Sequence, residues 1–369
     1  MDKRYLPERR GAAGAAVATL ATLAALGVLL AGCAGSAALR IDADLDAAYR
    51  AKMAGEFGTE GAMSETAGLL AAYGARFGKL PEGIAWRTLR TGSGLAVNAF
   101  LAGNPRGTAI VAHGYLDDST AMSGIIRTCL ESGWSVLAVD LPGHGLSGGP
   151  RADARDLAEY GRAMAEAADY AADYAADYAA DYAADYAADY AADYTEGFAA
   201  GRPLVAVAHS AGGLAALEWA RLERGAPGSR LAGIFLMAPL VRPRAWWLLG
   251  PLTGIADIFI DRLPVEAKEG LFLNPKYLPL GWTGALRRWL RRTEDFPVLD
   301  LPALVAYGEE ENVLDVGYAR RFFARVLPGA KWMTVEGGGH FGIAQGDASP
   351  VVRAALTEFL GELSRDAER

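Results

Sequence analysis

The feature that most constrains the fold is the recurrence of short apolar segments, each followed by a glycine-containing loop and a helical stretch. Continuous runs of Val, Ile, Leu and Ala are typical of strands buried on both faces of a parallel sheet. In such sheets, active sites form beyond the carboxyl ends of the strands. The spacing predicts an α/β fold with a mostly parallel, doubly wound sheet, whose strands are expected in TAIVAHG (108–114), SVLAVDL (135–141), PLVAVAHS (203–210), LAGIFLMAP (231–239), PALVAYG (302–308) and KWMTVEGG (331–338).

Two regions differ from this alternation of apolar segments and helical stretches. Residues 84–91 and 95–102 alternate apolar and polar residues around a Gly-Ser-Gly turn, which predicts an antiparallel hairpin. Residues 240–298 are apolar with scattered arginines, which predicts a mostly helical insertion. We interpret this insertion as a cap that supplies the substrate pocket, although ordinary helical packing is the alternative. Its tryptophans are Trp246, Trp247, Trp282 and Trp289.

Residues 167–194 consist of seven copies of Ala-Ala-Asp-Tyr. Alanine favours helix, and the segment lies between two expected strands, where a helix is needed. A four-residue step overshoots a helical turn by about 40°, so the tyrosine stripe winds around the helix and cannot face one core. One helix of this length would extend about 42 Å. We therefore expect a protruding or frayed spike that the chemistry does not require.

Composition excludes one class of function and leaves others open. The formal net charge of −8 argues against a nucleic-acid-binding surface. There are two cysteines, Cys33 and Cys129, and we expect no disulfide between them. Cys129 lies in the apolar helical stretch IIRTCLESGW and is expected to be a small core residue. The oligomeric state is left open by the sequence.

The N-terminus has the layout of an export signal, with a basic patch and then an uncharged, Ala- and Leu-rich run over residues 11–32. The run ends in Leu30-Ala31-Gly32-Cys33, which resembles the bacterial lipoprotein signal. The resemblance implies cleavage before Cys33 and lipidation of Cys33, with anchorage to a membrane in the cell envelope. Ala34 in place of Asp implies the outer membrane if the cell has two. The alternative is an uncleaved anchor, because about 20 apolar residues can span a bilayer.

The expected organisation combines these segments. A lipoprotein signal peptide is followed by a tether with an N-terminal helix, and the cap interrupts the catalytic core. The boundaries are 1–32 for the signal peptide, 33–80 for the tether, 81–239 and 299–369 for the two parts of the core, and 240–298 for the cap.

A motif with chemical meaning follows the third of these parallel strands. Residues 208–213 read Ala-His-Ser-Ala-Gly-Gly and precede the helical stretch LAALEWARLE. The small-x-Ser-x-small pattern is typical of a nucleophile elbow, where bulky neighbours would clash with adjacent backbone. The following helix would place its N-terminus and the Ala211 N–H beside a developing negative charge. A structural turn serine is the alternative, but the strand before and the helix after favour Ser210 as a nucleophile.

With this elbow, the chain resembles the α/β-hydrolase superfamily, and more closely its monoacylglycerol lipases, lysophospholipases and esterases. Residues 84–364 share the order of motifs of that group. Residues 113–114 (HG) resemble its oxyanion loop, which implies that the N–H groups of Tyr115 and Ala211 hold the oxyanion. Residues 140–147 (DLPGHGLS) resemble the turn that shapes the fold near the site.

The general base can be assigned because the chain has only four histidines. His209 is adjacent to Ser210, so its side chain points away from Oγ. His113 and His144 occupy turns that the family uses structurally. His340 follows the last expected strand in EGGGHF, which fits the order Ser, acid, His of this fold.

The resemblance places the triad acid three residues beyond Gly308, which here is Glu311 rather than the usual Asp. The extra methylene implies a loop that differs from the usual one. Asp315 is the rival, and Glu309 and Glu310 are the remaining candidates. An acidic turn exposed to solvent is the alternative interpretation of this cluster.

These residues predict two-step acyl transfer through an acyl-enzyme on Ser210, with no metal or organic cofactor. The resemblance and the apolar insertion imply a lipid-like carboxylic ester, such as a lysophospholipid or a monoacylglycerol. A thioesterase or amidase with the same triad is an alternative. So is a non-catalytic envelope lipoprotein that retains the hydrolase scaffold. Dehalogenases and epoxide hydrolases are disfavoured, because their nucleophile at this turn is Asp.

Overall fold

The computed structural model describes the part of the chain that carries the sheet, at residues 74–102, 104–169, 202–225, 229, 231–256, 260, 262–264 and 277–367. Backbone contacts divide the chain into Met1–Ala72 and Tyr73–Arg369, and all described residues belong to the second unit. The expected signal peptide, Cys33 and nearly all of the tether lie outside the described residues, as do residues 170–194 of the repeat.

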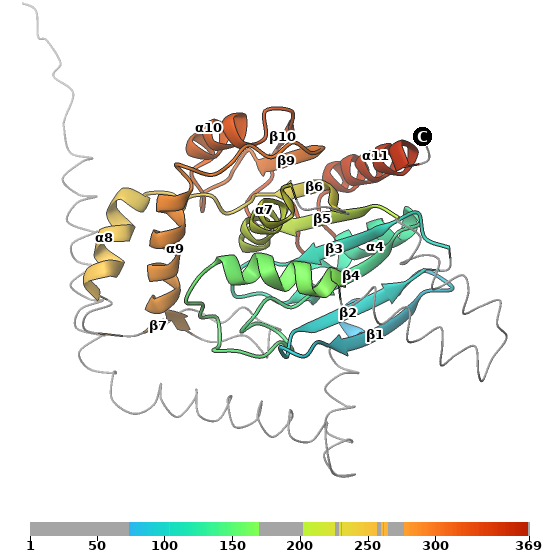
Figure 1. Cartoon of the computed structure of the whole chain (residues 1–369), viewed down its shortest axis with the longest axis horizontal. Coiled ribbons are helices and arrows are strands. Elements are labelled where there is room, and N and C mark those ends of the chain that lie inside the picture. The colour runs from blue at the N-terminus through green and yellow to red at the C-terminus, as the bar shows by residue number, and fades with distance from the viewer. Residues whose placement is uncertain are drawn as a thin grey trace, which may run out of the picture. The chain divides into compact units, whose positions relative to one another are not determined.

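Eight strands form one sheet in the order β1-β2-β4-β3-β5-β6-β9-β10 (Figure 1). β1 pairs antiparallel with β2, and β2 with β4, whereas every other neighbouring pair is parallel. The predicted parallel sheet and the predicted N-terminal hairpin are both confirmed. The strands are β1 Ala85–Arg90, β2 Ala96–Leu101, β3 Thr108–Ala112, β4 Ser135–Val139, β5 Leu204–His209, β6 Leu231–Met237, β9 Ala303–Gly308 and β10 Lys331–Val335.

Both faces of the sheet are covered. Every residue of β3, β4, β5 and β9 is buried. Successive side chains of a strand point to opposite faces, so complete burial requires cover on both. The 3-10 turn η1 (Ser119–Met122) leads into α4 (Ser123–Glu131), and α4 packs against α11 (Pro350–Ala367). The core also contains a helix at residues 158–169, α7 (Ala211–Glu223), which packs on β5, and α10 (Val316–Val326), which connects β9 to β10.

Aromatic side chains and one cysteine pack in the core between the helices and the sheet. Phe359 of α11 contacts Phe235 of β6, with ring centroids 5.8 Å apart. Phe77, just before the hairpin, packs edge-on against Phe100 of β2 at 4.9 Å. Cys129 of α4 is fully buried with a free thiol, as predicted for a core residue, and burial raises its pKa.

The predicted insertion between β6 and β9 is mostly helical in its described part. It contains α8 (Trp246–Ala256), α9 (Leu280–Arg292) and a short antiparallel ribbon of β7 (Arg262–Pro264) and β8 (Tyr277–Pro279). α8 and α9 lie side by side (Figure 1), and the Arg287 guanidinium joins them by donating to the Gly250 carbonyl oxygen at 3.0 Å. Within the described ranges, no helix is both long enough and apolar enough to cross a bilayer.

The tryptophans of α9 are buried, whereas one tryptophan of α8 is exposed. Trp282 and Trp289, seven residues apart, are both buried, and they lie on one face because two helical turns span about seven residues. The Trp289 indole donates a buried hydrogen bond of 2.6 Å to Glu218 of α7. In contrast, Trp247 of α8 is 80% exposed. The insertion is therefore fastened to the core through α9.

Close packing of two core helices generates a stability prediction. In the helix at residues 158–169, a Cβ on Gly161 would lie 2.5 Å from the Glu218 Cβ of α7. We expect Gly161→Ala to lower the free energy of unfolding by about 1–3 kcal/mol through overpacking. Gly361→Ala in α11 is the matched helical control, since its Cβ would meet only the end of Arg365 at 3.7 Å. The control should gain up to about 1 kcal/mol from helix propensity. Chemical denaturation measures both, and equal stability of Gly161→Ala and wild type would contradict the prediction.

Candidate active site

Ser210 lies in a strained turn between β5 and α7. Its backbone has φ 51° and ψ −114°, a left-handed conformation that L-residues rarely adopt. The turn needs very close backbone packing on both sides. A Cβ on Gly212 would lie 2.4 Å from the Ala112 carbonyl oxygen of β3, and one on Gly213 would lie 2.6 Å from Pro239. The two glycines of the motif are therefore required by space.

The structure brings Ser210, His340 and Glu311 into one chain of hydrogen bonds. His340 Nε2 lies 3.1 Å from Ser210 Oγ, and His340 Nδ1 lies 2.7 Å from Glu311 Oε2. The three residues follow β5, β10 and β9, at the carboxyl ends of strands in the parallel part of the sheet, where β6 separates β5 from β9. Because a carboxylate accepts, Nδ1 carries the proton in this arrangement, and Nε2 is left to accept the Ser210 hydroxyl proton.

Glu311 is held as an ionised acceptor. Its side chain is 1% exposed, and its Oε1 accepts the backbone N–H groups of Val313 at 2.7 Å and Leu314 at 3.0 Å. Burial raises the pKa of Glu311. The hydrogen bond and charge of His340, together with the two backbone donors, outweigh burial and lower this pKa below its ordinary value. The Glu311 side chain, which is one methylene longer than that of Asp, is thus accommodated by a turn whose N–H groups bind its second carboxylate oxygen.

The rival Asp315 is engaged elsewhere. Its carboxylate caps α10 by accepting the Tyr318 N–H at 2.8 Å and pairs with Arg242 at 2.5 Å. Glu309 and Glu310 are exposed. Among these four acids, the His340 imidazole contacts Glu311.

The loops that bear Glu311 and His340 are joined by main-chain contacts. A Cβ on Gly308, at the end of β9, would lie 2.0 Å from the Gly338 carbonyl oxygen. That same oxygen accepts the N–H of Glu310 at 2.9 Å. The loop bearing Glu311 and the loop bearing His340 are therefore packed directly against each other.

The expected oxyanion loop lies against the elbow. A Cβ on Gly114 would lie 3.3 Å from the Ser210 Cβ, so the backbone leading to Tyr115 passes directly beside Ser210. His113 Nε2 accepts the Leu141 N–H at 3.0 Å, and its Nδ1 consequently donates to the Gly114 carbonyl at 2.7 Å. The two expected oxyanion donors thus lie on different segments next to Ser210. Tyr115 follows Gly114 in the expected oxyanion loop, and Ala211 begins α7.

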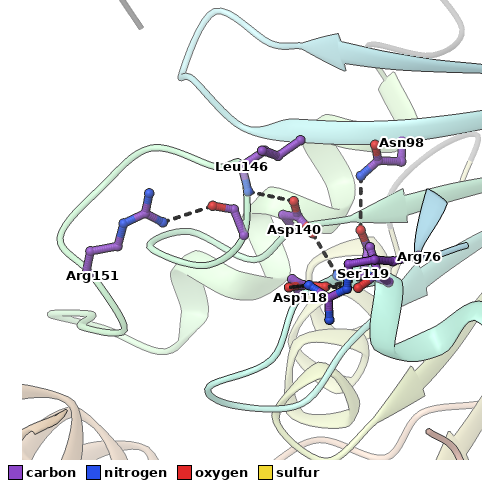
Figure 2. A network of polar contacts seen from close by, with 9 residues as sticks. Arg76, Asn98, Asp118, Ser119, Asp140, Leu146 and Arg151 are labelled. Carbon is purple, nitrogen blue, oxygen red and sulfur yellow. Dashed lines mark hydrogen bonds and ion pairs between the residues drawn. The ribbon is translucent and has the colours of Figure 1, made fainter. Parts of the chain in front are cut away.

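A buried polar network binds the segment that follows this loop (Figure 2). The Asp140 carboxylate accepts the N–H groups of Ser119 and Leu146, each at 2.8 Å. Asp118 caps η1 by accepting the Thr120 N–H at 3.0 Å. Burial and the neighbouring Asp140 raise the pKa of Asp118 despite its hydrogen bond from Thr120. The network ties residues 140–147 to the segment that follows Tyr115, which gives that turn a structural role.

The remaining histidines do not contact Ser210 Oγ through their rings. His144 is buried and its Nδ1 lies 3.0 Å from the Pro142 carbonyl oxygen, and burial lowers its pKa to about 3. The His209 Nε2 lies 2.9 Å from the His340 carbonyl oxygen. Sequence reasoning assigned His209 no role, because its partner is 131 residues away along the chain.

The insertion reaches the site through one aromatic stack that sequence reasoning did not identify. The Trp282 ring of α9 stacks on the Tyr115 ring, with centroids 3.9 Å apart and planes at 21°. The Trp282 indole also donates to the Tyr160 hydroxyl at 3.2 Å, and the Tyr115 hydroxyl donates to the Ala152 carbonyl at 2.6 Å. The apolar composition of residues 240–298 was the only signal for this contact. In the part of the chain that is described, no group of three or more His, Cys, Asp or Glu side chains could hold a metal ion.

Comparisons with known proteins agree with this architecture. Residues 103–279 match the family described as serine aminopeptidase, S33. The monoacylglycerol lipase of Mycolicibacterium smegmatis is 39% identical over 57 residues, a match that covers 15% of this chain and 20% of that relative. The aligned part thus spans only about a fifth of that relative's length.

Solved structures share the fold at low sequence identity. The monoacylglycerol lipase of Paleococcus ferrophilus superposes with a TM-score of 0.53 at 14% identity, covering 76% of this chain and 98% of that one. A soluble variant of the monoglyceride lipase of Saccharomyces cerevisiae gives a TM-score of 0.53 at 14% identity, with 78% and 96% covered. A hydrolase structure from Agrobacterium vitis gives 0.55 at 16% identity, with 76% and 98% covered.

The eight-stranded sheet and these superpositions define the class of fold: the chain has the α/β-hydrolase fold. The chain is similar in sequence to a monoacylglycerol lipase over a short segment, and over residues 103–279 it is similar to the serine aminopeptidase family.

The two acidic residues near β9 can be separated by matched amide substitutions. Glu311→Gln should lower kcat by about 10³–10⁴-fold, because an amide at this position cannot hold the His340 tautomer or stabilise its cation. Asp315→Asn should leave kcat unchanged and lower the free energy of unfolding by at most about 1 kcal/mol, since its ion pair is partly exposed. Steady-state hydrolysis of a p-nitrophenyl ester and chemical denaturation are the measurements. The reverse pattern would move the acid role to Asp315.

Proposed function

We propose that this protein is a serine hydrolase that cleaves carboxylic esters through an acyl-enzyme on Ser210. The observation that carries the proposal is the hydrogen-bonded series Ser210 Oγ, His340 and Glu311, at 3.1 Å and 2.7 Å. A serine hydroxyl, an imidazole and a carboxylate in this order are the arrangement that activates a hydroxyl at neutral pH.

Each step uses an atom whose position is described. Ser210 Oγ attacks the ester carbonyl carbon while His340 Nε2 takes its proton, and Glu311 stabilises the imidazolium that forms. The tetrahedral intermediate collapses as the leaving alcohol takes the proton from Nε2. Water then attacks the acyl-enzyme, with His340 as base again, and releases the acid and free Ser210.

The oxyanion is proposed to bind the backbone N–H groups of Ala211 and Tyr115. Ala211 is the first residue of the 13-residue helix α7, whose N-terminal dipole also favours negative charge. Tyr115 is held by the Trp282 stack on one side and by the bond from its hydroxyl to Ala152 on the other. Donors held in place before the reaction need no reorganisation, and one such donor typically contributes about 3 kcal/mol to the transition state.

The proposed substrate is a lipid-like ester, such as a monoacylglycerol or a lysophospholipid. Two observations support an apolar acyl group: the similarity to monoacylglycerol lipases, and an apolar insertion whose Trp282 reaches the proposed oxyanion loop. The match of residues 103–279 to serine aminopeptidases favours a second candidate, hydrolysis of an amide by the same triad.

A labelling experiment tests the nucleophile and a substrate panel tests the class. A fluorophosphonate probe should phosphonylate wild-type protein and should not label Ser210→Ala. Ser93→Ala, at an exposed serine, is the matched control and should label fully. Monoacylglycerols, lysophospholipids, acyl thioesters and aminoacyl amides are then compared by kcat/KM. Labelling of Ser210→Ala equal to wild type would remove Ser210 from its role, and a preference for amides would select the second candidate.

The proposed localisation is the cell envelope, with a lipid anchor on Cys33. Its support is the sequence alone: a basic patch, an apolar run and the tetrad Leu30–Cys33. Such an anchor would keep the enzyme beside membrane lipids.

The anchor is tested by acylation in bacterial cells. Wild-type protein should incorporate an alkyne-tagged palmitate and sediment with membranes, because an acylated N-terminus partitions into lipid. Cys33→Ser should not incorporate the label, whereas Cys129→Ser, the matched cysteine control in the core, should incorporate it. Unlabelled wild-type protein that still sediments with membranes would instead favour an uncleaved apolar anchor.

A further inference from the structure

His209 immediately precedes Ser210, yet its ring faces the loop that bears His340. The residue is completely buried at the end of β5. Its Nε2 lies 2.9 Å from the carbonyl oxygen of His340. A carbonyl oxygen only accepts, so Nε2 must carry the proton and donate it. The residue beside the nucleophile thus binds the main chain of the proposed general base.

The same ring fills the space between the two loops that flank Ser210. On one side, a Cβ on Gly114 would lie 3.0 Å from His209 Nδ1, so the ring packs directly against the expected oxyanion loop. On the other side, the His209 and His340 ring centroids are 5.0 Å apart, and the Phe341 ring lies at 6.4 Å. His209 is therefore in contact with both loops while it is covalently joined to Ser210.

His340 is held both through its ring and through its main chain. Its imidazole is bound to Glu311 through Nδ1, at 2.7 Å. The ring also contacts Ser210 Oγ through Nε2, at 3.1 Å. Neither ring contact fixes the main chain of His340, and a displacement of that main chain would change the distance from Nε2 to Ser210 Oγ. The hydrogen bond from His209 fixes the main chain from which the imidazole projects, and it does so from the strand that carries the serine.

We infer that His209 is a positioning residue for the proposed acyl transfer, which sets the distance between His340 Nε2 and Ser210 Oγ through its hydrogen bond to the His340 carbonyl. This inference rests on the proposed function. It assigns His209 no contact with the substrate and no proton transfer. Misplacement of a reacting group by about 1 Å can lower a rate by about 10²-fold, so this single bond is expected to have a measurable effect.

The test compares side chains that differ in whether they can reach the carbonyl. Gln carries an amide N–H at nearly the distance of Nε2, Asn carries one too short to reach, and Leu has similar bulk without a donor. His209→Leu and His209→Asn should lower the acylation rate constant for a p-nitrophenyl ester, measured before the first turnover is complete, by about 10²-fold with the substrate dissociation constant unchanged. His209→Gln should recover most of the rate. Because Gln and Asn are both polar amides, their comparison remains valid even if the Leu variant does not fold.

Two controls separate positioning from a general loss of core packing. Thr128→Val removes a comparable buried hydrogen bond, from Thr128 Oγ1 to the Gly124 carbonyl at 2.8 Å, and should leave the acylation rate unchanged. In a His340→Ala background, His209→Leu should cause no further loss, because a residue that acts only through His340 has nothing left to position.

The outcomes distinguish this inference from the proposed function. Equal rates for His209→Leu, His209→Asn and wild type, in a protein whose labelling still depends on Ser210, would overturn the positioning role alone. A full additional loss in the His340→Ala background would also overturn it. Labelling that does not depend on Ser210 would instead overturn the proposed function.

Discussion

The close approach of main chain around Ser210 is the constraint on which the rest of the site depends. A left-handed serine at the end of β5 is tolerated because Gly114 and Gly212 leave no side chains where the adjacent strands and loops must pass. The strain of such a residue costs of order 1–3 kcal/mol and persists only when the surroundings over-determine it. Here the sheet order supplies those surroundings, since β5 lies between β3 and β6 with every residue buried. The hydroxyl is thereby directed toward the loops at the carboxyl edge.

Two further loops are positioned by contacts that do not involve the reacting atoms. Gly308 and Gly338 hold the loop that bears Glu311 against the loop that bears His340 through main-chain contact. His209 holds the His340 main chain from the opposite side. The imidazole therefore lies between a carboxylate and a hydroxyl whose separation is set by backbone. The network around Asp140 does the same for the segment that follows Tyr115 (Figure 2). The backbone at the ends of the strands thus sets the positions from which the polar side chains of the site project.

The insertion contacts this framework beside the proposed oxyanion loop and on the helix that follows Ser210. Its helix α9 contacts the core through Trp282 on Tyr115 and Trp289 on Glu218 of α7, the helix that begins at the elbow. A change in the position of α9 would therefore act on the proposed oxyanion loop directly. α8 lies outside α9 and is joined to it by Arg287, with Trp247 exposed to solvent. The inner helix thus belongs to the site, and the outer helix forms the surface of the insertion.

The sequence by itself determined the parallel sheet, the hairpin and the elbow, because these depend on short-range patterns of apolar residues and glycine. It also limited the candidates for the proposed general base to four histidines. Only the tertiary structure decided which acid contacts His340, because Glu311 and Asp315 are four residues apart and chemically alike. The turn after β9 directs Glu311 toward His340, whereas an ion pair with Arg242 directs Asp315 elsewhere. The bond from His209 to His340 and the stack of Trp282 on Tyr115 were likewise decided by the fold. Such contacts join residues more than a hundred positions apart, and no local pattern encodes which distant groups will meet.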